Sequence, residues 1–295
     1  MNGLLLVNKA AGMTSHDVVA RARRLLNTKE VGHSGTLDPM ATGLMVLLIG
    51  EATKLSSFVT EGDKSYEVGF KLGVTTDTLD TTGAVLTEKQ VLNTPQEIID
   101  CALSLSGEFL LPIPMFSAKK IDGKKLYEYA REGLAVEIPQ KNMKFWDVTK
   151  LSLNEYSLHC SKGTFIRSWV KLLGEKLGPG ATMSSLKRTS SHKYSLDEAV
   201  TLEQLENLSA QEISNRLVPM DQALKGVKSI RIKGQDAVLM KNGQISHPLR
   251  SQLITRFNPA QDEVIQILPD ERGKLLALVG IEFGQGFKIK RVFNC

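Results

Sequence analysis

The sequence predicts a globular protein that combines α-helices with β-strands and has a second, smaller β-rich domain at its C-terminal end. The chain has 295 residues, of which 42% are hydrophobic, and this length is enough for about two domains with cores of their own. Helical and alternating apolar patterns follow one another up to Gly226. Beyond it, short apolar runs are separated by the turn-forming segments KNGQ, DERGK and GQG, a texture typical of a small β-rich domain. We therefore predict domains at 1–226 and 227–295.

Composition argues against several classes of protein. The longest apolar run, 44–49, is far shorter than the roughly 20 residues of a membrane span, and the segment MNGLLLVNKAAG lacks the basic and apolar regions of a signal peptide. The cysteines Cys101, Cys160 and Cys295 are scattered, and neither they nor the histidines have the spacing of a metal or redox site. We therefore expect a soluble, unexported protein of the reducing cytoplasm, without a metal.

The first elements follow from local patterns. LLLVNKAAGMTSHDVVARARRLLN predicts a short buried strand, a turn at Gly12 and a helix in which Thr14 and Asp17 form a capping box. The apolar side of this helix faces inward, with Val18, Ala22, Leu25 and Leu26.

Two further strands and a helix are predicted downstream. SYEVGFKLG alternates, so Tyr66, Val68, Phe70 and Leu72 share one face of a strand. YSLHCSKG predicts another strand. TFIRSWVKLLGEKLG predicts an amphipathic helix with Thr164 as its N-cap, ended by GPG at 178–180.

The stretch VGHSGTLDPMATGL contains a single carboxylate, Asp38. Asp before Pro is a favoured N-cap, so on spacing alone LDPMATGLMVLL could simply begin a helix. Arg167 offers a second interpretation, since it lies at about position N3 counted from Thr164, where the helix dipole disfavours a cation unless an anion compensates. A buried Asp38 could be that anion, while the alternative for Arg167 is an exposed side chain. The fingerprints of ATP and NAD sites are absent from the sequence.

Positive charge is concentrated in two places. Residues 228–295 contain 11 Lys and Arg against 6 Asp and Glu, whereas residues 1–227 contain 26 of each sign. The segment SAKKIDGKKLYEYAR has five Lys and Arg against two acids, a predicted tight turn at Asp122-Gly123, and interleaved tyrosines. Either region could be merely solvated surface, but lysines with aromatics on a projecting element are also typical of RNA binding.

Five segments together resemble the TruB family of bacterial pseudouridine synthases, which modify the T-loop of tRNA. GHSGTLDPMATGLMVLLIGEATK resembles the catalytic motif, LLLVNKAAGMTSHDVV the N-terminal motif, and KSYEVGFKLGVTTDTLDTTG the tyrosine-bearing strand and loop. IPMFSAKKIDGKKLYEYAREG resembles the RNA-gripping insertion, here about 114–133, and HCSKGTFIRSWVKLLGEKLG the arginine motif. The segments keep the family's order and cover residues 4 to about 193. The arginine motif reads GTFIR where GTYIR is frequent, and SSLKRTSSHKY matches only loosely.

The resemblance implies an α+β catalytic domain around a largely antiparallel sheet, followed by a C-terminal domain similar to the PUA-like RNA-binding module. It also implies that Asp38 is the catalytic aspartate, that Tyr66 stacks on the target base and that Arg167 pairs with Asp38. His33 would enter the T-loop, Asp80 and Leu186 would line the pocket, and Lys9 and Lys54 would support the catalytic loop. The insertion would contact RNA through Lys119, Lys124 and Tyr127.

The implied reaction converts the uridine at tRNA position 55 to pseudouridine after the base is flipped out. It needs neither cofactor nor metal, because the N1–C1′ bond is exchanged for a C5–C1′ bond without net redox change. One carboxylate can act as a nucleophile at C1′ or as a base at C2′, and the sequence does not choose between them. We expect a cytoplasmic monomer that needs no protein partner and no membrane. Two alternatives stay open: a tRNA-binding or folding factor without essential turnover, and a relative guided by a separate RNA.

Overall fold

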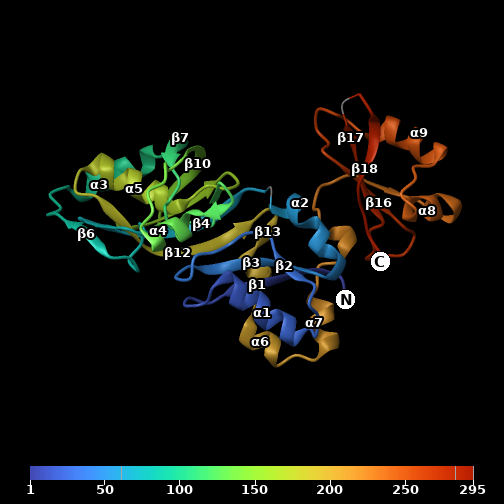
Figure 1. The fold of residues 1–295 in the computed structure, drawn as a ribbon, viewed down its shortest axis with the longest axis horizontal. Coiled ribbons are helices and arrows are strands. Elements are labelled where there is room, and N and C mark those ends of the chain that lie inside the picture. The colour runs from blue at the N-terminus through green and yellow to red at the C-terminus, as the bar shows by residue number, and fades with distance from the viewer. Residues whose placement is uncertain (61, 283, 295) are drawn as a thin grey trace.

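In the computed structural model, which describes residues 1–60, 62–282 and 284–294, the chain is built around one long sheet (Figure 1). Cys295 therefore lies outside the described residues. The sheet is ten-stranded. Its strands are β1 Gly3–Lys9, β2 Val31–His33, β3 Thr42–Ile49, β4 Lys64–Leu72, β7 Gly107–Pro112, β10 Gln140–Lys150, β11 Glu155–Cys160, β12 Ala181–Ser191, β13 Tyr194–Ser195 and β14 Val200–Thr201.

The order along the sheet is β14-β1-β3-β12-β4-β11-β10-β7, with β2 on β3 and β13 on β12. Only the β1–β14 and β3–β12 pairs of this sheet are parallel among the described residues. The α+β class with a largely antiparallel sheet is thus confirmed. The longest pairing joins β4 to β12, with Tyr66 opposite Arg188 and Val68 opposite Leu186.

Helices and short 3-10 helices cover the sheet and join its strands. The helices are α1 Ser15–Leu25, α2 Ser56–Thr60, α3 Pro95–Ser104, α4 Leu126–Glu132, α5 Ile166–Leu177, α6 Leu202–Glu206, α7 Ala210–Arg216, α8 Gly234–Lys241 and α9 His247–Arg256. The 3-10 helices are η1 Gly50–Leu55, η2 Leu196–Glu198 and η3 Met220–Gln222. A small hairpin is formed by β5 Val74–Thr76 and β6 Val85–Glu88.

Helix α5 packs on β12 through a fully buried side that includes Trp169, whose indole donates to the carbonyl of Leu105 at 3.2 Å. A Cβ on Gly174 would lie 2.1 Å from the backbone nitrogen of Ala181, so only glycine lets the helix approach the strand this closely. The predicted Thr164 N-cap is wrong. The cap is Phe165, without a side-chain bond, because the Thr164 hydroxyl is instead within hydrogen-bonding distance of Ser161 (3.1 Å) in the preceding turn.

The capping box at the start of α1 is confirmed: Thr14 accepts from the amide of Asp17 at 3.1 Å, and the Asp17 carboxylate accepts from the amide of Thr14 at 2.8 Å. The helix-start interpretation of Asp38 is wrong. The chain makes a turn closed by the bond from the Ala41 amide to the Asp38 carbonyl (3.0 Å) and continues as β3. An apolar run of strand length does not distinguish helix from strand, and here it is a buried central strand.

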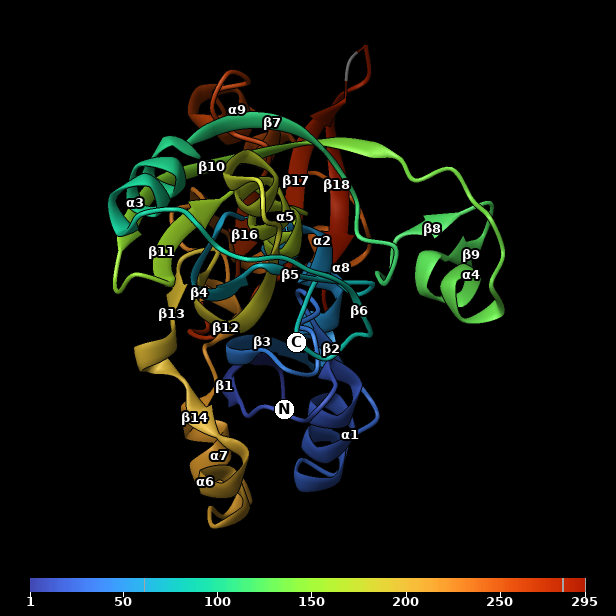
Figure 2. The ribbon, with the colours of Figure 1, turned by 90° about the vertical axis from the view of Figure 1, so that its left-hand side faces the viewer.

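The segment from 114 to 133 projects sideways from the body (Figure 2). It contains the hairpin of β8 Lys120–Ile121 and β9 Lys124–Lys125, followed by α4. Asp122 and Gly123 both have positive φ, 49° and 83°, which is the geometry of the predicted tight turn. Leu126 anchors the segment in the main core with no exposed surface.

The C-terminal end forms a separate four-stranded sheet, seen at one end of the long axis in Figure 1. Its strands are β15 Ser229–Arg231, β16 Ile265–Leu268, β17 Ala277–Glu282 and β18 Gly286–Val292. The structure also places α8 and α9 here, two helices that the apolar runs did not predict. Leu268, Leu278 and Phe293 share a buried cluster with Leu4 and Leu44 of the body, so this module is packed against the large sheet.

Across residues 1–60, 62–282 and 284–294, no helix has the length and apolar character needed to cross a membrane. The same residues contain no cluster of three metal-binding side chains.

Candidate active site

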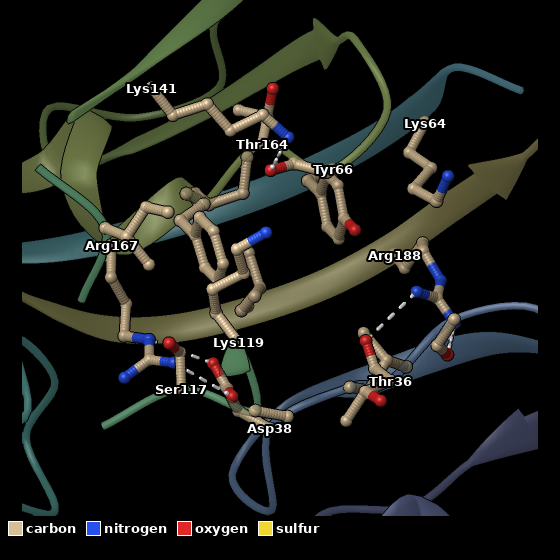
Figure 3. A pocket seen from close by; sticks show the side chains of 18 of the residues that line it. Thr36, Asp38, Lys64, Tyr66, Ser117, Lys119, Lys141, Thr164, Arg167 and Arg188 are labelled. Atoms are coloured by element: carbon tan, nitrogen blue, oxygen red, sulfur yellow. Dashed lines mark hydrogen bonds and ion pairs between the residues drawn. The ribbon is translucent and has the colours of Figure 1, made fainter. Parts of the chain in front are cut away.

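A pocket of about 680 Å³ lies against the face of the sheet that carries Tyr66. The segments around it are far apart in sequence: the loop 34–38, strand β4, the base of the insertion, the start of α5 and strand β12. Ten of the lining residues are labelled in Figure 3, namely Thr36, Asp38, Lys64, Tyr66, Ser117, Lys119, Lys141, Thr164, Arg167 and Arg188.

Hydrogen bonds hold the backbone of the loop on both sides of Asp38. The Ser15 hydroxyl both accepts from the Leu37 amide (2.9 Å) and donates to the Leu37 carbonyl (3.1 Å). The carbonyl of Pro39 accepts from the Lys9 ammonium (3.2 Å) and from the Gly12 amide (2.9 Å). Both neighbours of Asp38 are therefore held, and the carboxylate has a defined place at the pocket wall.

Glycine is required where β3 meets β12. A Cβ on Gly43, whose φ is 100°, would lie 2.3 Å from the carbonyl oxygen of Arg188. This glycine therefore serves a contact between two strands, whereas Gly35 is the motif glycine that lines the pocket.

Asp38 and Arg167 form a two-pronged ion pair (Figure 3). Nε of Arg167 lies 3.1 Å from Oδ2 of Asp38, and Nη2 donates to Oδ1 at 3.2 Å. The guanidinium also donates to the carbonyls of Thr78 and Phe116, both at 3.0 Å. These bonds hold the plane of the guanidinium in one orientation. Arg167 therefore orients the Asp38 carboxylate as well as neutralising its charge.

Burial raises the pKa of Asp38 above its ordinary value, and Asp80 acts in the same direction. The Arg167 guanidinium opposes this rise, followed by the Lys9 ammonium. Part of the Asp38 side chain, 30%, stays exposed toward the pocket. The result is an accessible carboxylate whose ionised form is disfavoured by burial and favoured by the Arg167 guanidinium.

Tyr66 lies on β4 with its ring toward the pocket and only 6% of its surface exposed. Burial raises the pKa of its hydroxyl, so the phenol stays protonated at neutral pH. Leu186 lies on the neighbouring strand β12 and also lines the pocket. A planar ring on one strand and an aliphatic side chain on the next, both lining the pocket, could bind the faces of a nucleobase.

Comparison with known proteins identifies the family to which the chain belongs. Residues 23–166 match "TruB family pseudouridylate synthase (N terminal domain)" and residues 167–225 match "tRNA pseudouridylate synthase B C-terminal domain". The chain is 54% identical over 299 aligned residues to the tRNA pseudouridine synthase B of Bdellovibrio bacteriovorus, covering 99% of this chain and 97% of that protein. This chain belongs to the TruB family of pseudouridylate synthases.

A second TruB relative, the tRNA pseudouridine synthase B of Alkaliphilus oremlandii, is 42% identical, with 82% of each chain covered. A solved chain of an H/ACA ribonucleoprotein bound to a substrate RNA containing 2′-deoxyuridine shares the fold with a TM-score of 0.69 and 19% identity. That match covers 99% of this chain and 85% of the other.

The structure brings five of the residues implied by the TruB resemblance into the pocket lining: Asp38, Tyr66, Lys119, Arg167 and Leu186. The other six lie outside that lining. Lys9 is fully buried behind the loop of Asp38, where burial lowers its pKa to about 8. Its ammonium donates to three carbonyls, including that of Pro39, so it supports the loop.

Lys54 lies elsewhere, paired with Glu51 (2.6 Å) and near the carbonyl of Val292 in the C-terminal module. Its ammonium therefore links the body to the module rather than touching the catalytic loop.

Neither Asp80, which the resemblance implied would line the pocket, nor His33 belongs to the pocket lining. The Asp80 carboxylate is buried and accepts bonds from Thr78 and Thr82 of its own loop (2.9 and 2.5 Å). His33 accepts from the Gly35 amide at 3.2 Å and meets the His16 ring edge-on, and burial lowers its pKa.

On the insertion, Lys124 lies over the ring of Tyr129 and is paired with Glu132. Tyr127 accepts a bond from Lys125 at 3.0 Å, and Arg131 lies over its ring. The tyrosines and cations of this projecting element thus already pack against one another.

Sequence reasoning missed several functional candidates, among them Arg188 and Lys64. Arg188 is 1% exposed and donates to the carbonyls of Leu44 (2.7 Å) and Gly35 (3.2 Å). Both line the pocket beside Tyr66. The signal was strand alternation: each lies two residues from a predicted pocket residue on the same strand, Lys64 before Tyr66 and Arg188 after Leu186.

Proposed function

We propose that this pseudouridylate synthase isomerises the flipped-out T-loop uridine of tRNA to pseudouridine, with Asp38 as the catalytic residue. The observation that supports this best is the composition of the pocket. Among the described residues, its lining has five cations, Lys64, Lys119, Lys141, Arg167 and Arg188, and one carboxylate, Asp38. Cations of this kind can bind the phosphates of an RNA backbone, while the single carboxylate is left to react with the sugar of the flipped-out nucleotide.

The cations are close enough to affect one another. Burial and then Arg188 lower the pKa of Lys64, and burial and then Lys119 lower the pKa of Lys141. A bound phosphate would relieve this repulsion, which favours a polyanionic substrate.

The reaction needs only groups of this chain. The bond between N1 and C1′ breaks, the detached uracil turns within the pocket, and C5 bonds to C1′ while the C5 proton is lost and N1 gains one. Asp38 acts on the sugar in one of two ways. Either its carboxylate bonds to C1′ as N1 leaves and is displaced when C5 bonds to C1′, or it takes a proton from C2′ as N1 leaves and returns that proton to C2′ when C5 bonds to C1′. Tyr66 keeps the base stacked, and Arg167 orients the carboxylate.

The decisive experiment is incubation of the purified protein with an unmodified T-arm RNA, followed by mapping of pseudouridine at single-nucleotide resolution. We expect conversion of the T-loop uridine alone, without a guide RNA. A matched RNA with cytidine at that position serves as the control. Tight binding without conversion would instead favour the binding or folding factor.

We propose that the Tyr66 hydroxyl also relays the proton lost from C5. Tyr66→Phe should then bind the T-arm RNA nearly as well as wild type but convert it slowly, because the ring is kept and the hydroxyl is lost. Tyr66→Ala should lose binding as well, since base stacking contributes about 1–3 kcal/mol. Single-turnover rates and equilibrium affinities measure the two effects separately. The control is Tyr156→Phe, a buried tyrosine stacked on Phe70 in the core. A wild-type rate for Tyr66→Phe would leave Tyr66 with stacking alone.

We also propose that the C-terminal module, as a PUA-like unit at 227–295, binds RNA phosphates. Replacing three exposed cations, Lys233, Lys241 and Arg250, by Gln should weaken tRNA binding. The plot of log K against log salt should become less steep, by about 0.7–0.9 in slope for each lost phosphate contact. The control removes three exposed lysines of the body, Lys89, Lys150 and Lys176. Equal slopes for both triple variants would show that the module faces water.

A further inference from the structure

Two side-chain hydroxyls on the pocket wall have no hydrogen-bond partner. The oxygens of Ser34 and Ser117 are both buried and unpaired, and both residues line the pocket. Buried polar groups are nearly always satisfied, so an unpaired one at a binding site calls for an explanation. Other buried serines close by are paired: Ser15 with Leu37, and Ser168 with the carbonyl of Pro112 at 2.8 Å.

Ser117 lies next to the reacting group. The residue before it, Phe116, gives its carbonyl to Nη2 of Arg167 at 3.0 Å, and the same nitrogen donates to Asp38. Figure 3 shows Ser117 beside this ion pair, on the side of the pocket away from Arg188 and Lys64. The Ser117 hydroxyl therefore belongs to the part of the pocket around the Asp38 carboxylate.

The proposed reaction determines which part of the substrate lies beside Asp38 and Ser117. Asp38 acts at C1′ or at C2′, and in both cases the ribose, rather than the base, lies against the carboxylate. The hydroxyl of the ribose nearest to both carbons is the 2′-OH. A serine can donate to it or accept from it, since a hydroxyl has one proton and two lone pairs. A 2′-OH is also the group by which proteins distinguish RNA from DNA.

We propose that Ser117 hydrogen-bonds the 2′-OH of the flipped nucleotide and so sets the preference for a ribonucleotide at the target position. This rests on the proposed function, because it assumes a uridine nucleotide in this pocket. Ser117 is then a specificity-determining residue that touches the substrate, and its hydroxyl is unpaired in the free protein because its partner arrives with the RNA.

The test compares the affinities of two T-arm RNAs that differ only at the target, uridine or 2′-deoxyuridine. Measuring in the Asp38→Asn background prevents turnover. We expect uridine RNA to bind about three- to tenfold more tightly than deoxyuridine RNA, the effect of one net hydrogen bond. Adding Ser117→Ala should bring this ratio close to one, and Ser117→Thr, which keeps a hydroxyl, should restore part of it.

Ser168→Ala is the matched control, because it removes a buried hydroxyl one residue from Arg167 that is already bonded within the protein. It should leave the ratio unchanged. An unaltered ratio in the Ser117→Ala variant, or an equal collapse with Ser168→Ala, would overturn the assignment. Failure of the proposed function has a different outcome, since wild-type protein would then convert no T-arm RNA at all.

Discussion

Asp38→Asn is expected to abolish pseudouridine formation, lowering the single-turnover rate by more than about a thousandfold, while RNA affinity changes by no more than about threefold. The amide keeps the size of the carboxylate and still accepts a bond from Arg167, but it can neither attack a carbon nor take a proton. The effect lies in the rate because Asp38 acts on the reacting bond. Rates and affinities are measured on the same T-arm RNA.

The control for this variant is Asp147→Asn on β10, an exposed aspartate with a φ of 50° that asparagine adopts equally well. It should convert RNA at the wild-type rate. Measurable turnover by Asp38→Asn would assign the sugar chemistry to another group of the pocket, and no other carboxylate lines it among the residues described.

Local chemistry predicted the elements whose ends are determined by their own residues. Thr14 and Asp17 satisfy each other's backbone amides, so the start of α1 could be read from four residues. The positive φ of Asp122 and Gly123 follows likewise from the dipeptide itself. The prediction of Thr164 as the N-cap was wrong because its hydroxyl lies within hydrogen-bonding distance of Ser161 in the preceding turn instead of capping α5.

The site depended on sheet order, which no local pattern contains. Asp38 and Arg167 are 129 positions apart; the helix-dipole argument offered their pairing as one of two interpretations, and the family resemblance implied it. Arg188 and Lys64 were missed because their importance arises from the pairing of β12 with β4, which sets Arg188 opposite Tyr66. An alternating strand shows which residues share a face, but not which face becomes a pocket wall.

The position of Lys54 also could not be predicted from the sequence. Its motif position implied a place near the catalytic loop, yet its ammonium meets Glu51 and the C-terminal module. The amide of Asn294 likewise donates to Glu51, at 2.7 Å. A contact between the body and the module is thus made by residues that belong to the catalytic motif's sequence, and only the tertiary structure reveals it.

The second large effect is expected at Arg167. Arg167→Lys should lower the rate by about a hundredfold or more, because a single ammonium cannot replace a planar fork that binds both carboxylate oxygens and two carbonyls. RNA affinity should change less than the rate. The matched control is Arg21→Lys, since Arg21 makes a similar two-pronged pair with Glu206 (2.6 and 2.7 Å) and neither residue lines the pocket. It should retain wild-type turnover.

Arg167→Ala should in addition change the pH dependence. Burial raises the pKa of Asp38 and Arg167 lowers it, so removing the guanidinium raises that pKa further. Since the reaction needs the ionised carboxylate, the rate increases as pH rises through this pKa, and the acid limb of the profile must move to higher pH. The variant should therefore recover part of its activity in alkaline buffer. Single-turnover rates from acid to alkaline pH test this: an unmoved limb would mean that Arg167 positions Asp38 without controlling its charge, and near-normal turnover by Arg167→Lys would mean that the fork is not required.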